Sequence, residues 1–423
     1  MSHGGESPGP PQLNVTRRSL LFGAGGAAVS GPALVQAQGL GSQLRVAVVG
    51  AGVFGTWTAE QLRRRGAYVS LIDAWSPGHS RSSSGGESRM TRAGYGKDAI
   101  YARMALASLT EWKKLSASAA LPLLHPHGVL FFFQGDNPYL ADSLRVHREL
   151  GLDTEALTAA QMQRRFPMID FAGVTAGMFE PGFGALMARR AVQTLAERFV
   201  AQGGNRRTLA VLPPYGDGAR LRQVRAAEGA AEADLFVFAC GPWLPKLFPE
   251  LLGQKIVATR QEVFTFAPPA GDLRYQSRQM PGWADFNGGD VYYGFPDLEG
   301  KGVKVAHDAH GFEVDPDTQD RRFSDKALAE VVAFRDRRFP GLRGAPLATA
   351  EVCQYENSSN GDLLIDRHPR WSNVVLVGGG SGHGFKHGPE VGRLAAELLL
   401  DGKTPDPRFG LAAKGTVQRR EVI

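Results

Sequence analysis

The sequence predicts an α/β protein with more than one domain, and two observations support this fold class. A short β-branched run near residue 44 leads into a glycine triplet and an amphipathic helix, which is typical of a strand–turn–helix unit in a parallel sheet. Helical and strand-like segments then alternate through the rest of the chain, without internal repeats. The chain has 423 residues and is therefore long enough for two or three domains, each with a sizeable core.

The first 37 residues are predicted to be a signal peptide of the twin-arginine type. Arg17 and Arg18 provide a charged start, a weakly apolar Gly/Ala-rich stretch follows, and Val35–Ala37 offer the small residues of a cleavage site. The alternative is a disordered tail with a chance arginine pair. The prediction implies that the twin-arginine export machinery is a partner, and that the mature protein of a bacterial host is periplasmic or secreted.

The segment after this leader predicts a buried parallel strand and a helix. Residues 44–49 form the β-branched run, and the helix follows the glycine triplet and extends to about residue 65. The inner side of this helix carries Trp57, Ala59 and Leu62.

Three glycines and one acid in this unit predict a dinucleotide site. Gly50 permits a tight turn, Gly52 lets the backbone approach a pyrophosphate, and Gly55 allows the helix to pack closely on the strand. The free N–H groups and the positive dipole of the helix N-terminus favour that pyrophosphate. A second strand, residues 68–72, leads to Asp73, where an acid can bind the ribose hydroxyls of the adenosine.

The loop after the second strand favours FAD over a nicotinamide cofactor. Residues 82–89 are small and rich in hydroxyl groups, and they include Ser84, Ser88 and Arg89. Such a loop can wrap the diphosphate and ribityl chain of a flavin, and it is not typical of a plain NAD dehydrogenase.

Further helices and strands are expected along the chain. The helices are expected near residues 101–114, 142–150, 187–201, 325–338 and 389–400. The strands are expected at residues 128–133, 235–239, 256–266, 290–295, 303–307 and 374–377. Cys240, directly after one of these apolar strands, is interpreted as a small core residue.

A second glycine-rich turn lies near the C-terminus. Residues 378–386 join a buried strand to a helix, and Gly380, Gly382 and Gly384 lie within the turn, followed by Phe385. Such a turn is an anion-binding shape. Next to a flavin, its positive end would stabilise the negative charge that reduction places on the ring.

The predicted fold is α/β, with a discontinuous Rossmann-like FAD-binding domain and a mixed-sheet substrate domain. Residues 42–117, 183–253 and 347–412 are assigned to the FAD-binding domain. Residues 118–182 and 254–346 are assigned to the substrate domain.

Composition argues against several other classes of protein. The formal charge is +6, but 48 basic residues are scattered among 42 acidic ones without a basic run, so nucleic-acid binding is not expected. No stretch of 18 apolar residues predicts a membrane-spanning helix, so no stable membrane insertion is expected. The two cysteines cannot form a disulfide framework, and no metal site is expected.

From about Leu44 to Thr404 the chain resembles the family of monomeric sarcosine oxidase, N-methyltryptophan, pipecolate and fructosyl-amino-acid oxidases, within the D-amino-acid-oxidase-like flavoproteins. Besides the first glycine triplet, the motifs that carry the resemblance are Gly86–Arg92, Tyr293–Pro296, Gly302–Lys304, Cys353–Tyr355 and Ser381–Lys386.

The resemblance implies how the cofactor is held. Cys353 lies 33 positions before Lys386, the spacing of the family's flavin-linking cysteine, and would form a thioether to the isoalloxazine methyl. Lys304 would lie near flavin N5 and hold positive charge where oxygen is reduced, because oxygen reduction builds up negative charge.

The resemblance also implies the substrate-binding residues. Arg92 and Lys386 would pair with the carboxylate of the substrate, and a fork-shaped guanidinium is suited to that task. Tyr293 and Tyr355 would line the pocket. The alternative for each cation is a structural or surface role.

Two departures from the sarcosine-type pattern argue against sarcosine itself as the substrate. Asp308 stands where those enzymes have a histidine, with His307 and His310 beside it. Residues 83–86 replace their histidine-rich flavin loop. The carboxylate of Asp308 either receives a second cationic group of a basic amino acid or is solvated.

The predicted function is FAD-dependent oxidation of the C–N bond of a carboxylate-bearing amino acid, with a secondary or N-substituted amine preferred. The product is an imine, and oxygen is reduced to hydrogen peroxide. One alternative is an exported amino-acid dehydrogenase that passes electrons to a quinone or cytochrome. Others are a nicotinamide-dependent dehydrogenase and a flavin-bearing binding or maturation protein with vestigial catalysis.

Overall fold

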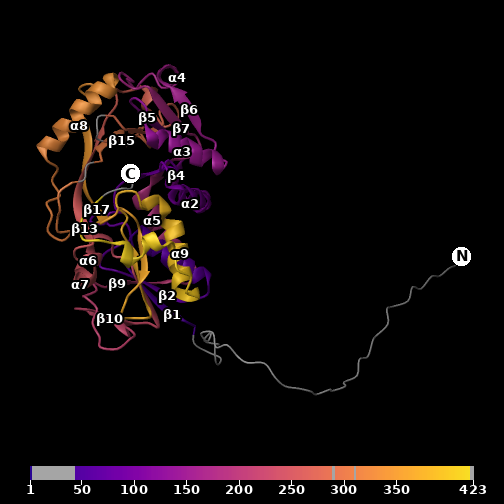
Figure 1. Ribbon diagram of the computed structural model, residues 1–423, viewed down its shortest axis with the longest axis vertical. Coiled ribbons are helices and arrows are strands. Elements are labelled where there is room, and N and C mark those ends of the chain that lie inside the picture. The colour runs from indigo at the N-terminus through magenta and orange to yellow at the C-terminus, as the bar shows by residue number, and fades with distance from the viewer. Residues whose placement is uncertain (2–42, 288–290, 309–310, 420–423) are drawn as a thin grey trace. The chain divides into compact units, whose positions relative to one another are not determined.

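The structure is a computed structural model (Figure 1), which besides Met1 describes residues 43–287, 291–308 and 311–419. These residues, from Gln43 onward, belong to one compact unit. The predicted signal peptide and His310 lie outside the described residues. Among the residues described, no helix has the length and apolar character required to cross a membrane.

A six-stranded sheet contains the N-terminal strand–turn–helix unit. Its strand order is β18-β19-β12-β1-β2-β9, with every neighbouring pair parallel except β18 and β19. The strands are β1 (Arg45–Val49), β2 (Tyr68–Asp73), β9 (Asn205–Thr208), β12 (Leu235–Phe238), β18 (Leu364–Arg367) and β19 (Val374–Gly378). The central strands are apolar and almost fully buried, as a parallel sheet requires. Sequence-distant segments therefore build one sheet, which confirms the predicted discontinuous Rossmann-like architecture.

Three long helices pack against this sheet: α1 (Val53–Arg64), α5 (Ala188–Ala201) and α9 (Gly388–Asp401). Helix α2 (Ala99–Ala117) packs on α9. Trp57, Ala59 and Leu62 of α1 are buried, and they share one apolar core with Val391 and Ala395 of α9. The C-terminal helix thus packs against the first helix of the chain, and this contact brings the second glycine-rich turn beside the first. Two shorter helices, α6 (Leu244–Leu247) and α7 (Pro249–Leu252), follow β12.

An eight-stranded mixed sheet forms the other large layer, in the order β17-β13-β16-β15-β14-β5-β7-β6. Only β14 and β5 are parallel neighbours. The strands are β5 (Val129–Phe133), β6 (Glu155–Thr158), β7 (Ala176–Glu180), β13 (Ile256–Phe266), β14 (Gly282–Asp285), β15 (Tyr292–Phe295), β16 (Val303–His307) and β17 (Leu347–Ser358). In Figure 1, β5, β6, β7 and β15 lie towards one end of the long axis, and β1, β2 and β9 lie towards the other.

Helix α8 (Asp325–Arg338) packs on the eight-stranded sheet, where Phe334 stacks on Trp283 with ring centroids 5.7 Å apart. Helices α3 (Pro138–Glu149) and α4 (Ala159–Arg165) both contact β7 of the same sheet. Smaller sheets are formed by β3 (Ser88–Thr91), β8 (Gly184–Met187) and β4 (Leu124–His125), and by β10 (Gln223–Ala226) and β11 (Gly229–Glu232). The short 3-10 helices are η1 (Gly241–Trp243), η2 (Leu273–Tyr275), η3 (Pro340–Leu342), η4 (Phe385–His387), η5 (Pro407–Phe409) and η6 (Leu411–Ala413).

Several elements differ from the sequence predictions, among them helix α3 and strand β17. Helix α3 begins at Pro138 rather than near residue 142, because the Asn137 side chain accepts a hydrogen bond from the Tyr139 N–H and caps the helix. Strand β17 was assigned by sequence to the FAD-binding domain, but it pairs along its whole length with β13 in the eight-stranded sheet. Long-range pairing of this kind leaves no local sequence signal. The predicted domain boundaries otherwise remain a prediction.

Candidate active site

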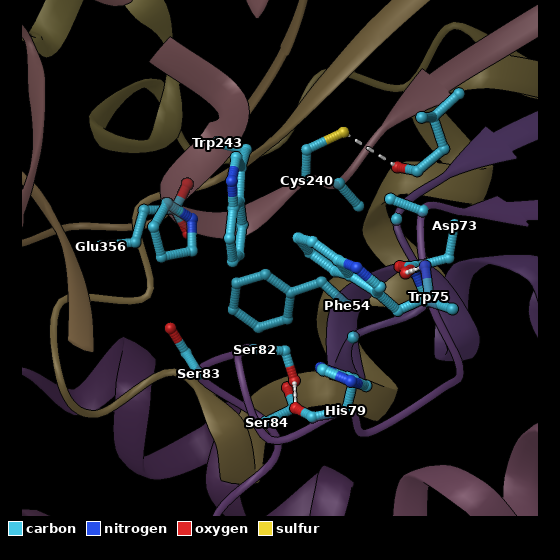
Figure 2. Close-up of a pocket in the computed structure, with 18 of the residues that line it drawn as sticks. Phe54, Asp73, Trp75, His79, Ser82, Ser83, Ser84, Cys240, Trp243 and Glu356 are labelled. Atoms are coloured by element: carbon cyan, nitrogen blue, oxygen red, sulfur yellow. Dashed lines mark hydrogen bonds between the residues drawn. The ribbon is translucent and has the colours of Figure 1, made fainter. Parts of the chain in front are cut away.

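A cavity of about 480 Å³ opens above the turn between β1 and α1 (Figure 2). Segments from distant parts of the sequence line it, including residues 49–54, 73–84, 209–213, 239–243, 354–356 and 380–385. Many of these segments follow the carboxyl ends of parallel strands, which is where open α/β sheets bind ligands.

The first glycine triplet has the close-packed geometry that a dinucleotide turn requires. Gly50 has φ +103°, a conformation that side chains other than glycine rarely adopt, and a Cβ at this position would lie 2.2 Å from the carbonyl oxygen of Ala239. A Cβ at Gly55 would lie 1.8 Å from the Gly50 oxygen. Gly52 is the N-cap residue of α1 and lines the cavity. Because it has no side chain, a ligand in the cavity can approach the backbone at this point.

Asp73 and Ser84 both stabilise this turn. The Asp73 carboxylate accepts hydrogen bonds from the N–H groups of Ala51 at 2.6 Å and Trp75 at 2.8 Å. Burial raises its pKa, although these two bonds favour the charged form. Ser84 Oγ accepts from the Val53 N–H at 3.0 Å, at the start of α1. Both side chains line the cavity, so they lie where a ribose and a diphosphate would be bound.

The second glycine-rich turn forms another wall of the same cavity, with Gly380, Gly382, Gly384 and Phe385. Ser381 within this turn has φ +45°, and its backbone N–H donates to the Glu356 carbonyl oxygen at 2.8 Å. This bond connects the turn to β17. Two glycine-rich turns at strand ends, one of them at the N-terminus of α1, together with aromatic rings, suit an elongated, anionic dinucleotide such as FAD.

A smaller cavity of about 90 Å³ adjoins the first. Arg89, Tyr355, Gly382 and Phe385 line both cavities, so the two spaces share one wall. The small cavity contains five of the six residues predicted to bind or convert the substrate: Arg92, Lys386, Tyr293, Tyr355 and Asp308. The fold thus brings together Arg92 after β3, Asp308 after β16, tyrosines of β15 and β17, and Lys386 of η4.

Arg92 and Lys386 both contact Tyr95, Arg92 at the face of the ring and Lys386 at the hydroxyl. The guanidinium carbon of Arg92 lies 4.2 Å from the centroid of the Tyr95 ring. Lys386 Nζ donates to the Tyr95 hydroxyl and to the His383 carbonyl oxygen, both at 2.7 Å. Burial, followed by repulsion from Arg92, lowers the pKa of Lys386 well below its usual value. An incoming carboxylate would favour the charged form of this lysine, because an adjacent opposite charge stabilises it.

Tyr293, Tyr355 and Asp308 form a hydrogen-bonded group on another wall. Tyr355 donates to Asp308 Oδ1 at 2.9 Å, and the Tyr293 and Tyr355 side chains are hydrogen-bonded to each other. Burial raises the pKa of Tyr293 to about 12, so the phenol stays neutral. Asp308 therefore already accepts one hydrogen bond in the structure.

Cys353 lies on β17 and lines the smaller cavity. Arg89 Nη2 lies 3.5 Å from its Sγ and also donates to the Ser83 carbonyl oxygen at 2.6 Å. Arg89 is thus placed beside both the sulfur and the wall common to the two cavities.

Lys304 and Ser88 are not among the residues that line either cavity. Lys304 is buried on β16 and lines neither cavity; its Nζ donates to the Ser88 carbonyl oxygen at 3.4 Å. Burial, together with repulsion from Arg89, lowers the pKa of Lys304 to about 7. The Ser88 side chain is also buried and outside both cavities, which differs from its expected direct contact with the cofactor.

Several lining residues were missed from the sequence. Cys240, expected to be a small core residue, packs against the apolar core around β12 and also lines the larger cavity, with its Sγ 3.4 Å from the Val49 carbonyl oxygen. Trp75, Trp243 and Glu356 also line that cavity (Figure 2). Their positions just after β2 and β12 and near the end of β17 were a usable signal, because strand ends in such sheets surround the ligand.

Comparison with known proteins gives consistent results. Residues 45–398 match the profile of the family DAO, described as FAD dependent oxidoreductase. The chain is 32% identical to a monomeric sarcosine oxidase of Streptomyces avermitilis, covering 86% of this chain and 95% of the relative. It is 30% identical to a monomeric sarcosine oxidase of a Bacillus species, covering 85% and 93%, and 29% identical to an N-methyl-L-tryptophan oxidase of Salmonella heidelberg, covering 85% and 95%.

Solved structures share the fold. The L-proline dehydrogenase of P. horikoshii matches with a TM-score of 0.77 at 21% identity, covering 88% of this chain and 98% of that one. NikD, an amino acid oxidase, matches with a TM-score of 0.72 at 21% identity, covering 87% and 98%. At this level of identity the likeness concerns the fold alone.

Proposed function

Since the chain belongs to the DAO family of FAD-dependent oxidoreductases, as its resemblance to the sarcosine-oxidase-like enzymes predicted, we propose that it oxidises the C–N bond of an amino acid that carries a free carboxylate. The proposed substrate is a secondary or N-substituted amine, the product is an imine, and oxygen is the electron acceptor. The relatives named sarcosine and N-methyltryptophan oxidases support this substrate class.

One observation carries the proposal: the smaller cavity combines two buried basic side chains with a tyrosine-lined wall and adjoins the larger cavity. Arg92 and Lys386 supply the basic groups, and Tyr293 and Tyr355 supply the wall. Charge-assisted hydrogen bonds to a carboxylate are about twice as strong as neutral ones, and the enclosure strengthens them further. A carboxylate held by the two cations would be fixed next to the wall shared with the cofactor cavity.

The C–H bond next to the amine nitrogen breaks, and its hydrogen leaves with both bonding electrons while the nitrogen loses a proton. Water then hydrolyses the resulting imine to a carbonyl compound and an amine. Oxygen gains two electrons and two protons and becomes hydrogen peroxide. FAD, when bound, would supply the two-electron acceptor between the substrate and oxygen.

The side chains of the small cavity orient the substrate and exclude water. Arg92 and Lys386 bind the carboxylate, and the Tyr355–Asp308 hydrogen bond at 2.9 Å holds the opposite wall in place. The Tyr355 hydroxyl has one hydrogen and donates it to Asp308 Oδ1, so it has no further hydrogen to donate to the substrate while this bond persists. In this proposal the two basic side chains hold the substrate by its carboxylate, which positions the C–N bond for oxidation.

A second candidate acceptor is a quinone or cytochrome, and the position of Lys304 favours it. In an oxidase, Lys304 would stabilise the negative charge that forms when oxygen is reduced. However, its side chain is buried outside both cavities. Burial and the nearby Arg89 also lower the pKa of Lys304 to about 7. A lysine that is only partly charged at neutral pH stabilises the charge of reduced oxygen less well. Reoxidation by oxygen and by a soluble quinone, timed separately, distinguishes the two acceptors.

Two further parts of the proposal concern attachment and location. Cys353 is proposed to bind the flavin covalently, supported by its place in the smaller cavity beside Arg89.

Residues 1–37 are proposed to direct twin-arginine export, supported by Arg17, Arg18 and the Val35–Ala37 cleavage site. The mature protein would then be periplasmic or secreted.

The test of the central proposal is anaerobic bleaching of the flavin absorbance by a panel of amino acids. N-alkyl, cyclic and basic amino acids are compared with the same amines lacking the carboxylate. We expect bleaching by at least one carboxylate-bearing amine and none by its decarboxylated analogue. A protein that binds FAD but is bleached by no amine would instead be a binding or maturation protein.

A further inference from the structure

Glu356 is a buried acid to which the proposed reaction gives no role. It lies on β17 directly after Tyr355, lines the larger cavity and is only 5% exposed. In Figure 2 it is drawn at the opposite side of the view from Asp73. Among the described residues, no basic side chain contributes to the charge state of Glu356, and no donor reaches its Oε1 atom.

The packing around Oε1 is unfavourable for a charge. A Cβ built at Gly378 would lie 2.3 Å from Oε1 and 2.9 Å from Leu244 Cδ2, so the glycine at the end of β19 leaves the space that the carboxyl group occupies. An ionised carboxyl oxygen enclosed against a glycine and a leucine, with no donor, would lose its hydration without compensation. Burial accordingly raises the pKa of Glu356 to about 8, and the N–H groups of Gly379 and Gly380 offset only part of this effect.

A neutral carboxyl group differs from a carboxylate in one respect that matters here: it carries an O–H donor. Oε1 is enclosed without a hydrogen-bond partner, while the side chain lines the larger cavity, so the proton is assigned to Oε2. The backbone of Glu356 is also fixed to the second glycine turn, because its carbonyl oxygen accepts from the Ser381 N–H at 2.8 Å. The donor is therefore held at a fixed place beside that turn.

We infer that Glu356 is a cofactor-binding residue, which in its protonated form donates a hydrogen bond from its carboxyl group to an acceptor atom of bound FAD. The inference rests on the assignment of FAD to the larger cavity. A dinucleotide offers many acceptor oxygens and carries negative charge, so a protonated acid attracts it where a carboxylate would repel it. The buried acid thus adds a donor to this wall of the cavity without adding a negative charge.

The experiment compares Glu356→Gln, which keeps the shape and a donor, with Glu356→Leu, which keeps the bulk and loses the donor. Glu351→Gln is the matched control, because Glu351 lies on the same strand but lines only the smaller cavity. FAD affinity is measured by flavin fluorescence in apoprotein carrying Cys353→Ser, so that the cofactor exchanges freely. We expect Glu356→Gln and the control to stay within about threefold of the parent, and Glu356→Leu to bind FAD about tenfold more weakly or worse.

Infrared difference spectra between the oxidised and reduced protein provide a second measurement that needs no cofactor exchange. We expect a C=O band of a protonated carboxyl group in wild type and in Glu351→Gln, and its loss in Glu356→Gln. The inference is wrong if Glu356→Leu binds FAD as tightly as the parent, if Glu356→Gln is as weak as Glu356→Leu, or if wild type lacks the band. Wild type without flavin would contradict the cofactor assignment, whereas a flavin that no amine bleaches would contradict only the proposed reaction.

Discussion

Lys386 Nζ donates a 2.7 Å hydrogen bond to the hydroxyl of Tyr95, a residue 291 positions away in the sequence. The same hydroxyl lies 2.8 Å from His387 Nε2 and 3.1 Å from His383 Nδ1, and all of these groups are buried. Tyr95 also stacks beneath the Arg92 guanidinium, so one phenol positions both cations proposed to bind the substrate carboxylate.

Replacing Tyr95 with Phe should therefore weaken carboxylate binding without loss of the cofactor. The change removes the acceptor of Lys386 and leaves buried groups unsatisfied, at a cost of about 1–3 kcal/mol. We expect the dissociation constant of a simple carboxylate inhibitor to rise roughly tenfold, while the flavin content stays unchanged. Tyr101→Phe is the control, because this neighbouring buried tyrosine donates to Asp362 instead. Equal effects of the two variants would indicate a purely structural role for Tyr95.

Replacing Arg92 with Ala should weaken the binding of substrates and inhibitors that carry a carboxylate. Loss of one charge-assisted bond costs about 1.5–3 kcal/mol, which corresponds to roughly one to two decades in kcat/KM. Arg92→Lys should recover only part of this loss, since an ammonium lacks the planar fork. Reoxidation of the pre-reduced protein, timed by stopped-flow, should remain near the wild-type rate. A normal affinity for carboxylate inhibitors in Arg92→Ala would exclude the proposed contact.

Lys304 should make the oxygen reaction depend on pH. Burial and the nearby Arg89 lower the pKa of Lys304 to about 7, so its ammonium is present below pH 7 and is lost as the pH rises through 7. Reoxidation of reduced wild type by oxygen should slow over that range, whereas Lys304→Met should be slow at every pH and reduced normally by substrate. Lys301→Met is the control, because Lys301 is exposed and pairs with Glu87. If Lys304→Met reoxidises at the wild-type rate, the lysine is structural.

Cys353 should hold the flavin covalently. Acid-denatured wild type should keep its yellow colour, and Cys353→Ser should release free FAD under the same treatment. Cys240→Ser is the control, because Cys240 lines the larger cavity but lies next to the Val49 carbonyl oxygen. Complete release of flavin from denatured wild type would exclude a covalent link.

The leader should direct export of the folded protein. Mature protein isolated from its native host should begin near Gln38, and joint replacement of Arg17 and Arg18 by Lys should retain it inside the cell, because the machinery recognises paired arginines. N-terminal sequencing and cell fractionation provide the measurement. Full-length protein in the cytoplasm of the unmodified host would count against the prediction.

Much of the fold could be predicted because its signals are local. The strand at residues 256–266 and the helix at residues 325–338 match β13 and α8 in both bounds, since each has a clear run of β-branched or helix-forming residues. The first glycine triplet was equally readable, because a strand, a turn and a helix in direct succession leave few alternatives. The pairing of β17 with β13 was not predicted, because register between distant strands depends on the whole sheet.

The sequence by itself determined the fold class, the two glycine-rich turns and, through family resemblance, the charged residues Arg92, Asp308 and Lys386 that line the smaller cavity. Only the tertiary structure decided how these residues are used. It placed Lys304 behind the cavity wall, joined Lys386 to Tyr95 and enclosed Glu356 against Gly378. The physical reason is that periodicity and turn residues report on neighbours along the chain, whereas burial and charge state depend on which distant segments pack around a side chain.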